Sequence, residues 1–403
     1  MTTLSEPDSH GLHVAVIGGG ASGTLTAVQL LRSAARRAVS LRVTLIDQHG
    51  RHGLGVAYST AYEGHLLNAM AGQMSALPDD PHHLVRWANA AGSRYQTATS
   101  ADVSDMSFLP RAVYGRYLRD LLAETARQAR PAGHLVELTA QVLAVRPNQA
   151  GPRLRVLLTD GHLDADIAVL ATGNSPARLP FDVPPTDRTV ADPWYPGALA
   201  DLLRCPGTRS VVIVGTGLTM ADLAIAITET SPDVIVHAVS RHGLLPRTHP
   251  GTAPPDRPLW LPAMSRTGGP VRLADLTWQV RSAIAANPAS WHDVICSLRP
   301  FVPALWHRMP IADKQSFIRH LARYWEIHRH LVPPPTARRL AALRVAGRLV
   351  IHRGRIEAVT TGGGQLGILV DSGRGAVGLR ADWLVNGTGM TSDITASDNP
   401  LLR

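Results

Sequence analysis

The stretch HVAVIGGGASG, residues 13–23, constrains this chain more than any other. Residues 14–17 are apolar and largely β-branched, which predicts a buried parallel strand. Three glycines follow in the spacing G-x-G-x-x-G, and apolar residues then recur every three positions, as one face of a helix requires. A second apolar run, LRVTLI, ends at Asp47. This order of elements predicts a βαβ unit that binds a dinucleotide: a strand, a glycine turn, a helix, a second strand and an acid.

Each glycine of this motif has its own physical role. Gly18 allows the tight turn, Gly20 lets the backbone approach a pyrophosphate, and Gly23 lets the helix pack close to the strand. The start of the helix offers free backbone N–H groups and the positive end of the helix dipole to the phosphates. Asp47 stands where a carboxylate accepts a hydrogen bond from a ribose 2′-hydroxyl.

A second βαβ unit is expected over residues 210–240, from SVVIVGTGLTMADLAIAI to DVIVHAVS. Gly215 and Gly217 repeat the first two glycines, but Met220 takes the third place, which predicts looser packing of the helix on its strand. Ser240 and Arg241 stand where an acid would follow the second strand. An acid there favours NAD, whereas an arginine accommodates the 2′-phosphate of NADP, so we expect this unit to bind NADPH.

Strand-rich segments on either side of this unit resemble each other. Residues 134–173 and 348–389 each read as three strands, and each closes in a strand followed by a turn of the form x-Thr-Gly. The pattern predicts an α/β fold with two Rossmann-like, three-layer dinucleotide-binding domains, the second inserted in the first. The expected boundaries are 1–180 for the first part of the FAD-binding domain, 181–346 for the NAD(P)H-binding domain, and 347–403 for an apparently truncated return to the first domain.

A helical insertion is expected at about 270–335. Its clearest element is ADKQSFIRHLARYWEIHRH, residues 312–330, in which Phe317, Leu321, Tyr324 and Trp325 recur at helical spacing. That spacing already explains these side chains as core rather than as ligand contacts. Further helices are expected at 81–90 and 113–128, and the low-charge loop between residues 51 and 80 either lines a pocket or packs as a plain connector.

Charge and composition exclude several classes of protein. The formal net charge is +9, but Lys314 is the single lysine and the arginines are scattered, so no basic stripe for nucleic acid is present. No apolar run approaches the roughly 18 residues of a membrane span, and the polar N-terminus does not read as a signal peptide, which predicts a cytoplasmic protein. Cys205 and Cys296 match neither a disulfide framework nor a C-x-x-C redox pair, and no metal site is expected.

The chain resembles the flavoproteins that bind FAD and NAD(P)H together, and within them a largely uncharacterised group of FAD/NAD(P)-binding proteins related to flavin N-monooxygenases. The resemblance rests on six strings that together reach across nearly the whole chain: GLGVAYST (53–60), HLLN (65–68), MSALPDDP (74–81), FLPRAVYGRYL (108–118), VGTGLTMAD (214–222) and SRHGLLPR (240–247). Members of the group normally continue beyond the second x-Thr-Gly turn, toward the flavin ring. Here the sequence ends at Arg403.

The resemblance implies FAD on the first unit and a nicotinamide nucleotide on the second. It assigns the FAD pyrophosphate to Gly18, Gly20, Ser22 and Gly23, the adenosine ribose to Asp47, and adenine to the backbone of Val142. It places Asn68 and Met74 near the flavin ring, and we include Thr172 and Gly173 of the first x-Thr-Gly turn among the cofactor-binding residues. On the second unit it implies Gly215, Gly217, Thr219, Ser240 and Arg241.

Three functions are compatible with these observations. The first is a flavin monooxygenase that uses NADPH and O₂ on a small-molecule substrate, including N-hydroxylation of amines. The second is an NAD(P)H-dependent flavin reductase that passes electrons to another acceptor, such as a partner protein. The third is a non-catalytic nucleotide-binding subunit. We favour the first, because a flavin carries the chemistry itself and the sequence shows no separate set of catalytic side chains. The sequence does not decide the oligomeric state.

Overall fold

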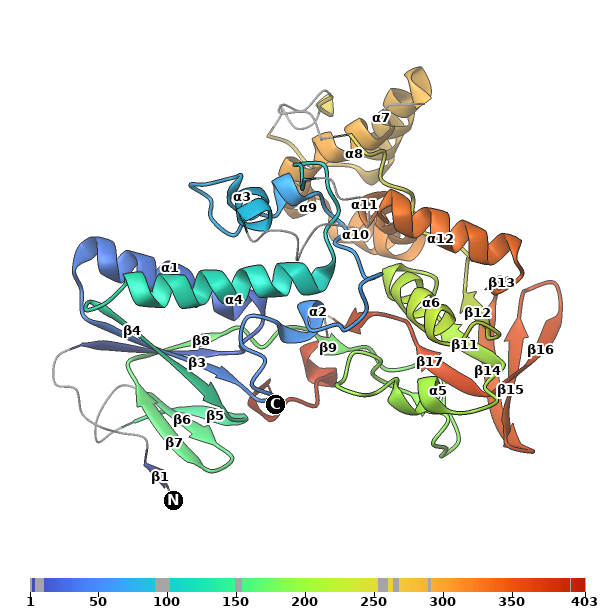
Figure 1. Ribbon diagram of the computed structural model, residues 1–403. Coiled ribbons are helices and arrows are strands. Elements are labelled where there is room, and N and C mark those ends of the chain that lie inside the picture. The colour runs from blue at the N-terminus through green and yellow to red at the C-terminus, as the bar shows by residue number, and fades with distance from the viewer. Residues whose placement is uncertain are drawn as a thin grey trace. The chain divides into compact units, whose positions relative to one another are not determined.

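The computed structural model describes residues 2–3, 11–90, 102–148, 154–252, 260–263, 268–288, 291–391 and 393–402. The chain divides into two compact units (Figure 1). Unit 1 comprises Met1–Asp182, Thr186–Gly207 and Thr388–Arg403, and unit 2 comprises Val183–Pro185 and Thr208–Gly387. We describe each unit by itself.

Unit 1 is built on a four-stranded parallel sheet in the order β4-β3-β2-β8. These strands are β2 (Leu12–Ile17), β3 (Leu41–Asp47), β4 (Gly133–Thr139) and β8 (Ile167–Leu170). The crossover from β2 to β3 is the helix α1 (Ala21–Arg37). In register, Ile17 lies beside Ile46 and Leu170, so the ends of the three strands meet at one edge of the sheet.

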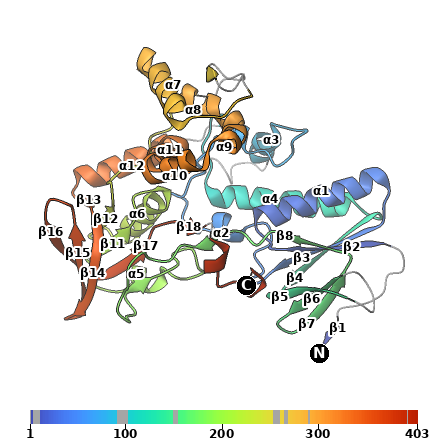
Figure 2. The same cartoon turned by 180° about the vertical axis from the view of Figure 1, so that it is seen from behind.

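Three layers make up unit 1, as the sequence predicts. Helices α1 and α4 (Arg111–Gln128) cover one face of the parallel sheet, and the antiparallel strands β5 (Val142–Pro147), β6 (Leu154–Leu158) and β7 (Gly161–Ala165) cover the other (Figures 1 and 2). Val14 and Val16 belong to the core on the helical side, whereas Ala15 and Ile17 belong to the core beneath the antiparallel strands. Burial on both faces explains why β2 reads as a continuous apolar run rather than an alternating one.

Shorter elements complete unit 1. They are β1 (Thr2–Thr3), α2 (Gly55–Tyr58), the 3₁₀ turn Ala71–Gln73, α3 (His83–Ala90), β9 (Ser175–Pro176), β10 (Thr189–Val190), α5 (Ala200–Arg204), β18 (Met390–Thr391) and the 3₁₀ turns Ile394–Ala396 and Pro400–Leu402. After the second x-Thr-Gly turn the chain returns to unit 1, where β18 pairs with β9 and the Ser397 hydroxyl bonds to that of Ser175.

Unit 2 repeats the plan of unit 1. Its parallel strands are β11 (Ser210–Val214), β12 (Ile235–Ser240), β13 (Leu349–Arg353) and β17 (Trp383–Asn386), in the order β17-β11-β12-β13. The crossover helix is α6 (Leu218–Thr230), and α12 (Pro334–Val345) precedes β13. The antiparallel strands β14 (Arg355–Gly362), β15 (Gln365–Asp371) and β16 (Ala376–Ala381) form a separate three-stranded sheet.

This arrangement corrects the expected assignment of residues 347–403. Strands β13 and β17 pair with β12 and β11, so residues 347–387 lie in unit 2, and the return to unit 1 begins at Thr388. The two strand-rich segments resemble each other because each completes the sheet of its own unit. Each holds five strands among its described residues instead of the expected three. The first expected strand is two strands, β4 and β5 or β13 and β14, and the sequence analysis missed β7 and β16.

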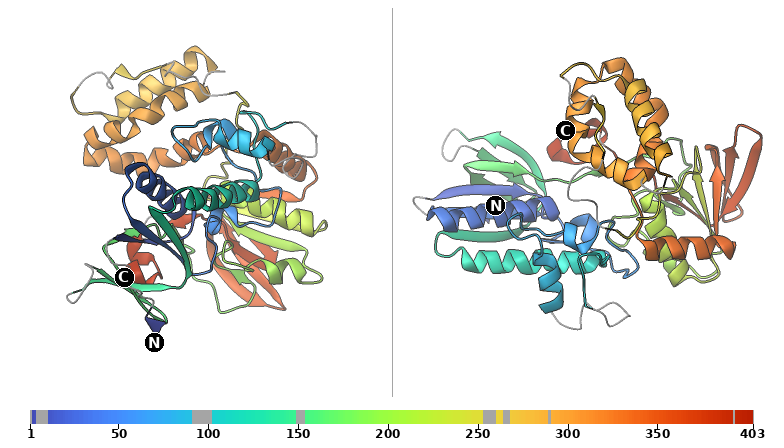
Figure 3. Two further views of the ribbon diagram at one scale, coloured as in Figure 1. Left: turned by 60° about the vertical axis from the view of Figure 1, so that its left-hand side comes forward. Right: turned by 90° about the horizontal axis from the view of Figure 1, so that it is seen from above.

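The helical insertion lies between β12 and α12 in unit 2 (orange in Figure 3). It consists of α7 (Leu273–Ala286), α8 (Trp291–Leu298), the 3₁₀ turn Arg299–Phe301, α9 (Val302–Arg308), α10 (Ile311–Ser316), a π-helical turn Phe317–Leu321 and α11 (Ala322–Arg329). The helix predicted over 312–330 is therefore present but is interrupted by the π turn. None of the helices in the described ranges has the length and hydropathy that crossing a membrane requires.

Candidate functional site

The first glycine turn of unit 1 has the geometry of a phosphate-binding loop. Gly18 has φ +115°, and its N–H donates to the carbonyl of Ile46 over 2.8 Å. A Cβ on Gly18 would lie 2.1 Å from the Ala171 carbonyl oxygen, and one on Gly23 would lie 1.8 Å from the Gly18 oxygen. Neither position therefore accepts any other residue without movement of the backbone. The turn is held against β8 on one side and against α1 on the other.

Gly20 leaves the start of α1 open. It is the N-cap residue of α1, its backbone is extended, and no side chain among the described residues caps the helix. A Cβ on Gly20 would meet a single described atom within 4 Å, Gly55 Cα at 3.6 Å. The first N–H groups of α1 are therefore free to bind an anion. Ser22 lies in this first turn and is exposed.

Asp47 is the last residue of β3 and is held by three backbone N–H groups. One carboxylate oxygen accepts from Gly19 at 3.2 Å, and the other accepts from His49 and Arg51 at 2.9 Å each. These contacts fix the carboxylate beside the glycine turn. Of its two oxygens, the one bonded to Gly19 accepts a single hydrogen bond among the described residues and keeps a lone pair for a ribose hydroxyl.

Other predicted residues of unit 1 fall into two groups. Thr172 and Gly173 follow the Ala171 carbonyl that contacts the Gly18 turn, and Gly173 has φ +74° with no described atom near its Cβ position. Val142 is the first residue of β5, and β4 ends just before it, at Thr139. In register Thr139 lies beside Asp47, so the chain enters β5 close to the acid.

Asn68 and Met74 lie on a different segment of unit 1. The residues around them bond to the stretch that leads into α4: Leu67 N–H donates to Leu109, and Ala71 N–H donates to Ser107. Met74 itself packs against the helical-side core. The nearness of these two residues to a flavin ring stays a prediction.

Four of the six strings that carry the family resemblance lie in unit 1, where they contact one another or the glycine turn. Gly53 of GLGVAYST donates its N–H to the Gly19 carbonyl over 2.9 Å. The bridge between Leu66 and Pro110 joins HLLN to FLPRAVYGRYL, and the Tyr117 hydroxyl accepts from Ala76 N–H at 3.1 Å. The low-charge loop therefore packs partly on the glycine turn. Its interpretation as a pocket-lining loop stays a prediction.

The second glycine turn, in unit 2, reproduces the backbone of the first. Gly215 has φ +114°, and its N–H donates to the carbonyl of Val239 over 2.7 Å. Gly217 is the N-cap of α6 in an extended conformation, and no described atom lies within 4 Å of its Cβ position. Thr219, in the first turn of α6, is half-buried. Met220 is fully buried, so α6 packs tightly despite the missing third glycine.

Ser240 ends β12, in the place that Asp47 takes at the end of β3. Its hydroxyl lies 2.8 Å from that of Thr216 and accepts from Gly243 N–H at 3.0 Å. Because Thr216 donates its own proton to the Leu244 carbonyl, Ser240 donates to Thr216. Ser240 thus closes the turn, and the neutral hydroxyl leaves the site without a negative charge.

Positive charge gathers just beyond Ser240. The pKa of His242 is lowered, first by burial and then by the positive charges of four arginines: Arg323, Arg241, Arg353 and Arg355. Arg241 is exposed, and Arg353 lies beside Ser240 in the pairing of β12 with β13. Of the four, sequence reasoning identified Arg241. The other three come from α11, β13 and β14, and no spacing in the sequence connects them with Arg241.

One atom of this cluster lacks a partner. Among the described residues, the buried Nε of Arg323 has no hydrogen bond, although its Nη1 donates to the Arg319 carbonyl over 2.9 Å. A buried donor without an acceptor is rare and costly. Its place in a cluster of arginines fits an anionic ligand such as a nucleotide phosphate.

Comparison with known proteins agrees with this geometry. Residues 15–175 match the family of FAD-NAD(P)-binding domains, and this stretch contains the whole of the first glycine turn, Asp47 and the Ala171-Thr172-Gly173 turn. An uncharacterised protein of Escherichia coli K12, YdhS, is 25% identical over 231 residues. The aligned part is 53% of this chain and 39% of YdhS, less than two thirds of that protein's length.

Solved structures extend the similarity to most of the chain. The ornithine hydroxylase PvdA from Pseudomonas aeruginosa, in its reduced form, gives a TM-score of 0.58 at 16% identity, over 94% of this chain and 82% of that one. The ornithine N-hydroxylase of Kutzneria sp. 744, with reduced FAD, NADP⁺ and L-ornithine, gives 0.52 at 16% identity, over 94% and 81%. At such identities the likeness shows the fold: two Rossmann-like dinucleotide-binding units.

Proposed function

We propose that this chain is an FAD-dependent monooxygenase that takes its electrons from NADPH and oxygenates a small molecule. The observation that carries the proposal is the repetition of one glycine turn, with φ +115° at Gly18 and +114° at Gly215. An enzyme that transfers electrons from a nicotinamide to a flavin needs two dinucleotide sites, one for each cofactor. The cytoplasm, where NADPH is the common reductant, is the compartment we propose.

FAD fits unit 1. The open space beside Gly20 and the free N–H groups at the start of α1 suit a pyrophosphate, and Asp47 suits a ribose hydroxyl. When bound, the flavin supplies hydride acceptance and activation of O₂. The chain's part is to hold the cofactor: Gly18 makes the tight turn with its positive φ, and Gly20, without a side chain, lets the backbone come close to the phosphates.

NADPH fits unit 2 better than NADH does. Ser240 removes the carboxylate that would repel a 2′-phosphate, and Arg241 with its neighbouring arginines supplies the opposite charge. The lone Nε of Arg323 is a further donor for a phosphate oxygen. We therefore assign Arg241 to the 2′-phosphate of NADPH and propose that Arg323 and Arg353 bind the same phosphate.

An absorption spectrum of the purified full chain tests the proposal. We expect flavin bands, bleached when NADPH is added without oxygen and restored by air. A colourless protein that takes up no added FAD would contradict the assignment of unit 1 and favour a non-catalytic role.

Primary amines are the first substrates to test, because the structural neighbours are ornithine hydroxylases. Ornithine, lysine and cadaverine should be compared for stimulation of NADPH oxidation and for a product one oxygen atom heavier. Fast turnover with artificial electron acceptors, without amine stimulation or oxygen incorporation, would instead identify a flavin reductase.

A further inference from the structure

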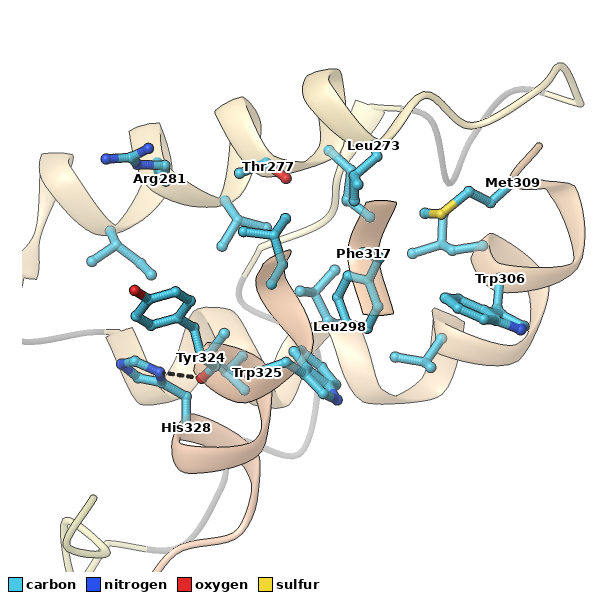
Figure 4. Close-up of a pocket in the computed structure, with 17 residues that line it drawn as sticks. Leu273, Thr277, Arg281, Leu298, Trp306, Met309, Phe317, Tyr324, Trp325 and His328 are labelled. Atoms are coloured by element: carbon cyan, nitrogen blue, oxygen red, sulfur yellow. Dashed lines mark hydrogen bonds between the residues drawn. The ribbon is translucent and has the colours of Figure 1, made fainter. Parts of the chain in front are cut away.

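The helical insertion of unit 2 forms a half-open cavity of about 600 Å³, which is lined by none of the residues assigned above to FAD or NADPH (Figure 4). Helices α7, α8 and α9, the π turn and α11 all contribute to its wall. The volume lies within the range of about 300–1,000 Å³ typical of small-molecule sites. The sequence analysis interpreted Phe317, Leu321, Tyr324 and Trp325 as core, and all four line this cavity. Phe317, Leu321 and Trp325 also pack on the core of the insertion, whereas Tyr324 is 46% exposed, so the interpretation as core was wrong for Tyr324.

The cavity is elongated along α7. Its contacts on that helix fall on one face, at Leu273, Leu276, Thr277, Val280, Arg281 and Ile284. The last of these residues lies eleven positions after the first, and at a rise of 1.5 Å per residue this is a length of about 16 Å. A site of this volume and length is a channel beside three turns of one helix, and it suits an extended chain better than a compact ring system.

The wall is apolar along most of that length. Leu298, Leu305 and Met309 are buried side chains of the surrounding core, and Phe317 and Trp325 pack against them. Val280 and Ile284 face the cavity from α7. An apolar ligand in this space would gain dispersion contacts that the empty cavity lacks.

One end of the cavity is different in chemistry. Figure 4 shows Arg281, Tyr324 and His328 toward one end, and Leu273, Trp306 and Met309 toward the other. The His328 ring is held by its Nδ1, which donates to the Tyr324 carbonyl over 2.7 Å. The Arg281 guanidinium and the Tyr324 hydroxyl supply hydrogen-bond donors at this end, and Arg281 supplies a positive charge.

We propose that this cavity binds a medium-chain aliphatic carboxylate, with its alkyl chain along α7 and its carboxylate between Arg281 and Tyr324. The guanidinium of arginine matches a carboxylate in charge and in the geometry of its donors. A primary ammonium group would be repelled by the same arginine, so the ligand differs in charge from the amines proposed as substrates. The site lies within unit 2 and does not depend on bound flavin.

Calorimetric titration of the full chain with sodium decanoate tests this inference, with decanol and decylamine as neutral and cationic comparisons. We expect decanoate to bind at least tenfold more tightly than decylamine. Replacing the exposed Arg281 by glutamine should weaken decanoate about tenfold or more and leave decanol unchanged, because a charge-assisted contact is lost. Arg338→Gln, an exposed arginine on α12 that does not line the cavity, is the matched control and should change neither affinity.

A second variant tests the location. Val280→Phe places a larger side chain in the channel and should abolish binding of decanoate and decanol together, while circular dichroism and NADPH affinity stay at wild-type values. If Val280→Phe unfolds the protein, Thr277→Leu, on the same cavity-lining face of α7, replaces it and should lower decanoate affinity. Undetectable decanoate binding to the wild-type chain, or equal binding by the wild type and by a folded Val280→Phe protein, would overturn the proposal. Equal loss of decanol and decanoate in Arg281→Gln would overturn the placement of the carboxylate.

Discussion

Unit 1 and unit 2 form the same glycine turn at the start of a crossover helix, but with different residues around it. Both use four parallel strands in one order, β4-β3-β2-β8 and β17-β11-β12-β13 read from opposite edges, and both begin the crossover helix at a glycine with extended backbone. The first glycine of each turn has nearly the same φ, +115° and +114°. What the two units share is therefore backbone geometry, which is what a pyrophosphate contacts.

The differences lie where side chains act. Gly23 of unit 1 corresponds to the buried Met220 of unit 2, and Asp47 corresponds to Ser240 followed by Arg241. On the proposed assignment, binding of the phosphates and choice of nucleotide are separable. We expect the glycine turn to bind the phosphates and the residue at the end of the second strand to select the nucleotide.

The largest effect should come from closing one turn and leaving the other open. Gly20→Val puts a side chain into the open space beside the start of α1. The nearest described atom to the Cβ position is Gly55 Cα, at 3.6 Å, so the protein has room for the side chain and should still fold. We expect a folded protein that purifies without flavin, since the backbone no longer reaches the pyrophosphate. Gly217→Val is the matched control in unit 2: it should purify yellow and fail to be reduced by NADPH. A yellow Gly20→Val protein would contradict the assignment of FAD to unit 1.

The next prediction concerns the third position of each motif. A Cβ on Gly23 would lie 1.8 Å from the Gly18 oxygen, so Gly23→Ala forces the turn apart. We expect a loss of about 3 kcal/mol in the free energy of unfolding, measured by urea denaturation, at the upper end for overpacking. Met220→Ala in unit 2 acts in the opposite sense, by leaving a cavity, and should cost about 2–5 kcal/mol. A Gly23→Ala protein as stable as the wild type would show that the turn of unit 1, like that of unit 2, does not require glycine at the third position.

The sequence predicted the repeated βαβ units because glycine spacing and apolar runs are local patterns. It predicted helix α4 within two residues of its start for the same reason. It misassigned residues 347–387, because strand pairing is not local: the same apolar run would fit the sheet of either unit, and only its pairing with β11 and β12 decides.

The candidate site of unit 2 shows the same limit. Arg241 follows β12 directly and was found from its position, whereas Arg323 and Arg353 come from residues about 80 and 110 positions further along, and the fold brings them together. The sequence could not predict the cavity of the insertion either, because helical spacing at Phe317, Leu321 and Trp325 is equally typical of a closed core. The π turn that interrupts this helix has no signature in the sequence.

Acid should destabilise unit 2 through His249, which is 7% exposed and whose burial, with the nearby His292 and Arg299, lowers its pKa to about 4. Between pH 6.5 and pH 4 the unfolded chain binds a proton that the folded His249 does not, so stability falls as the pH falls through this window. The loss should reach up to about 3 kcal/mol at pH 4. Urea denaturation at pH 7.5, 5.5 and 4.5 measures it, and His249→Gln should flatten the pH dependence. An unchanged slope in that variant would assign the acid sensitivity elsewhere.

The smallest and most specific effect concerns Arg241, which follows the second strand of unit 2 and has no counterpart in unit 1. Arg241→Ala removes one charge from a cluster that retains Arg323, Arg353 and Arg355. Loss of a charge-assisted contact of about 1.5–3 kcal/mol should raise the KM for NADPH about tenfold or more and leave the KM for NADH nearly unchanged, because NADH lacks the 2′-phosphate. Steady-state oxidation of both nucleotides by the yellow protein measures this, and Arg338→Gln controls for a general loss of positive charge on unit 2. An equal change for the two nucleotides would mean that Arg241 contributes to the shared pyrophosphate or to folding. In that case the two units would differ in sequence at the end of the second strand without differing in which nucleotide they select.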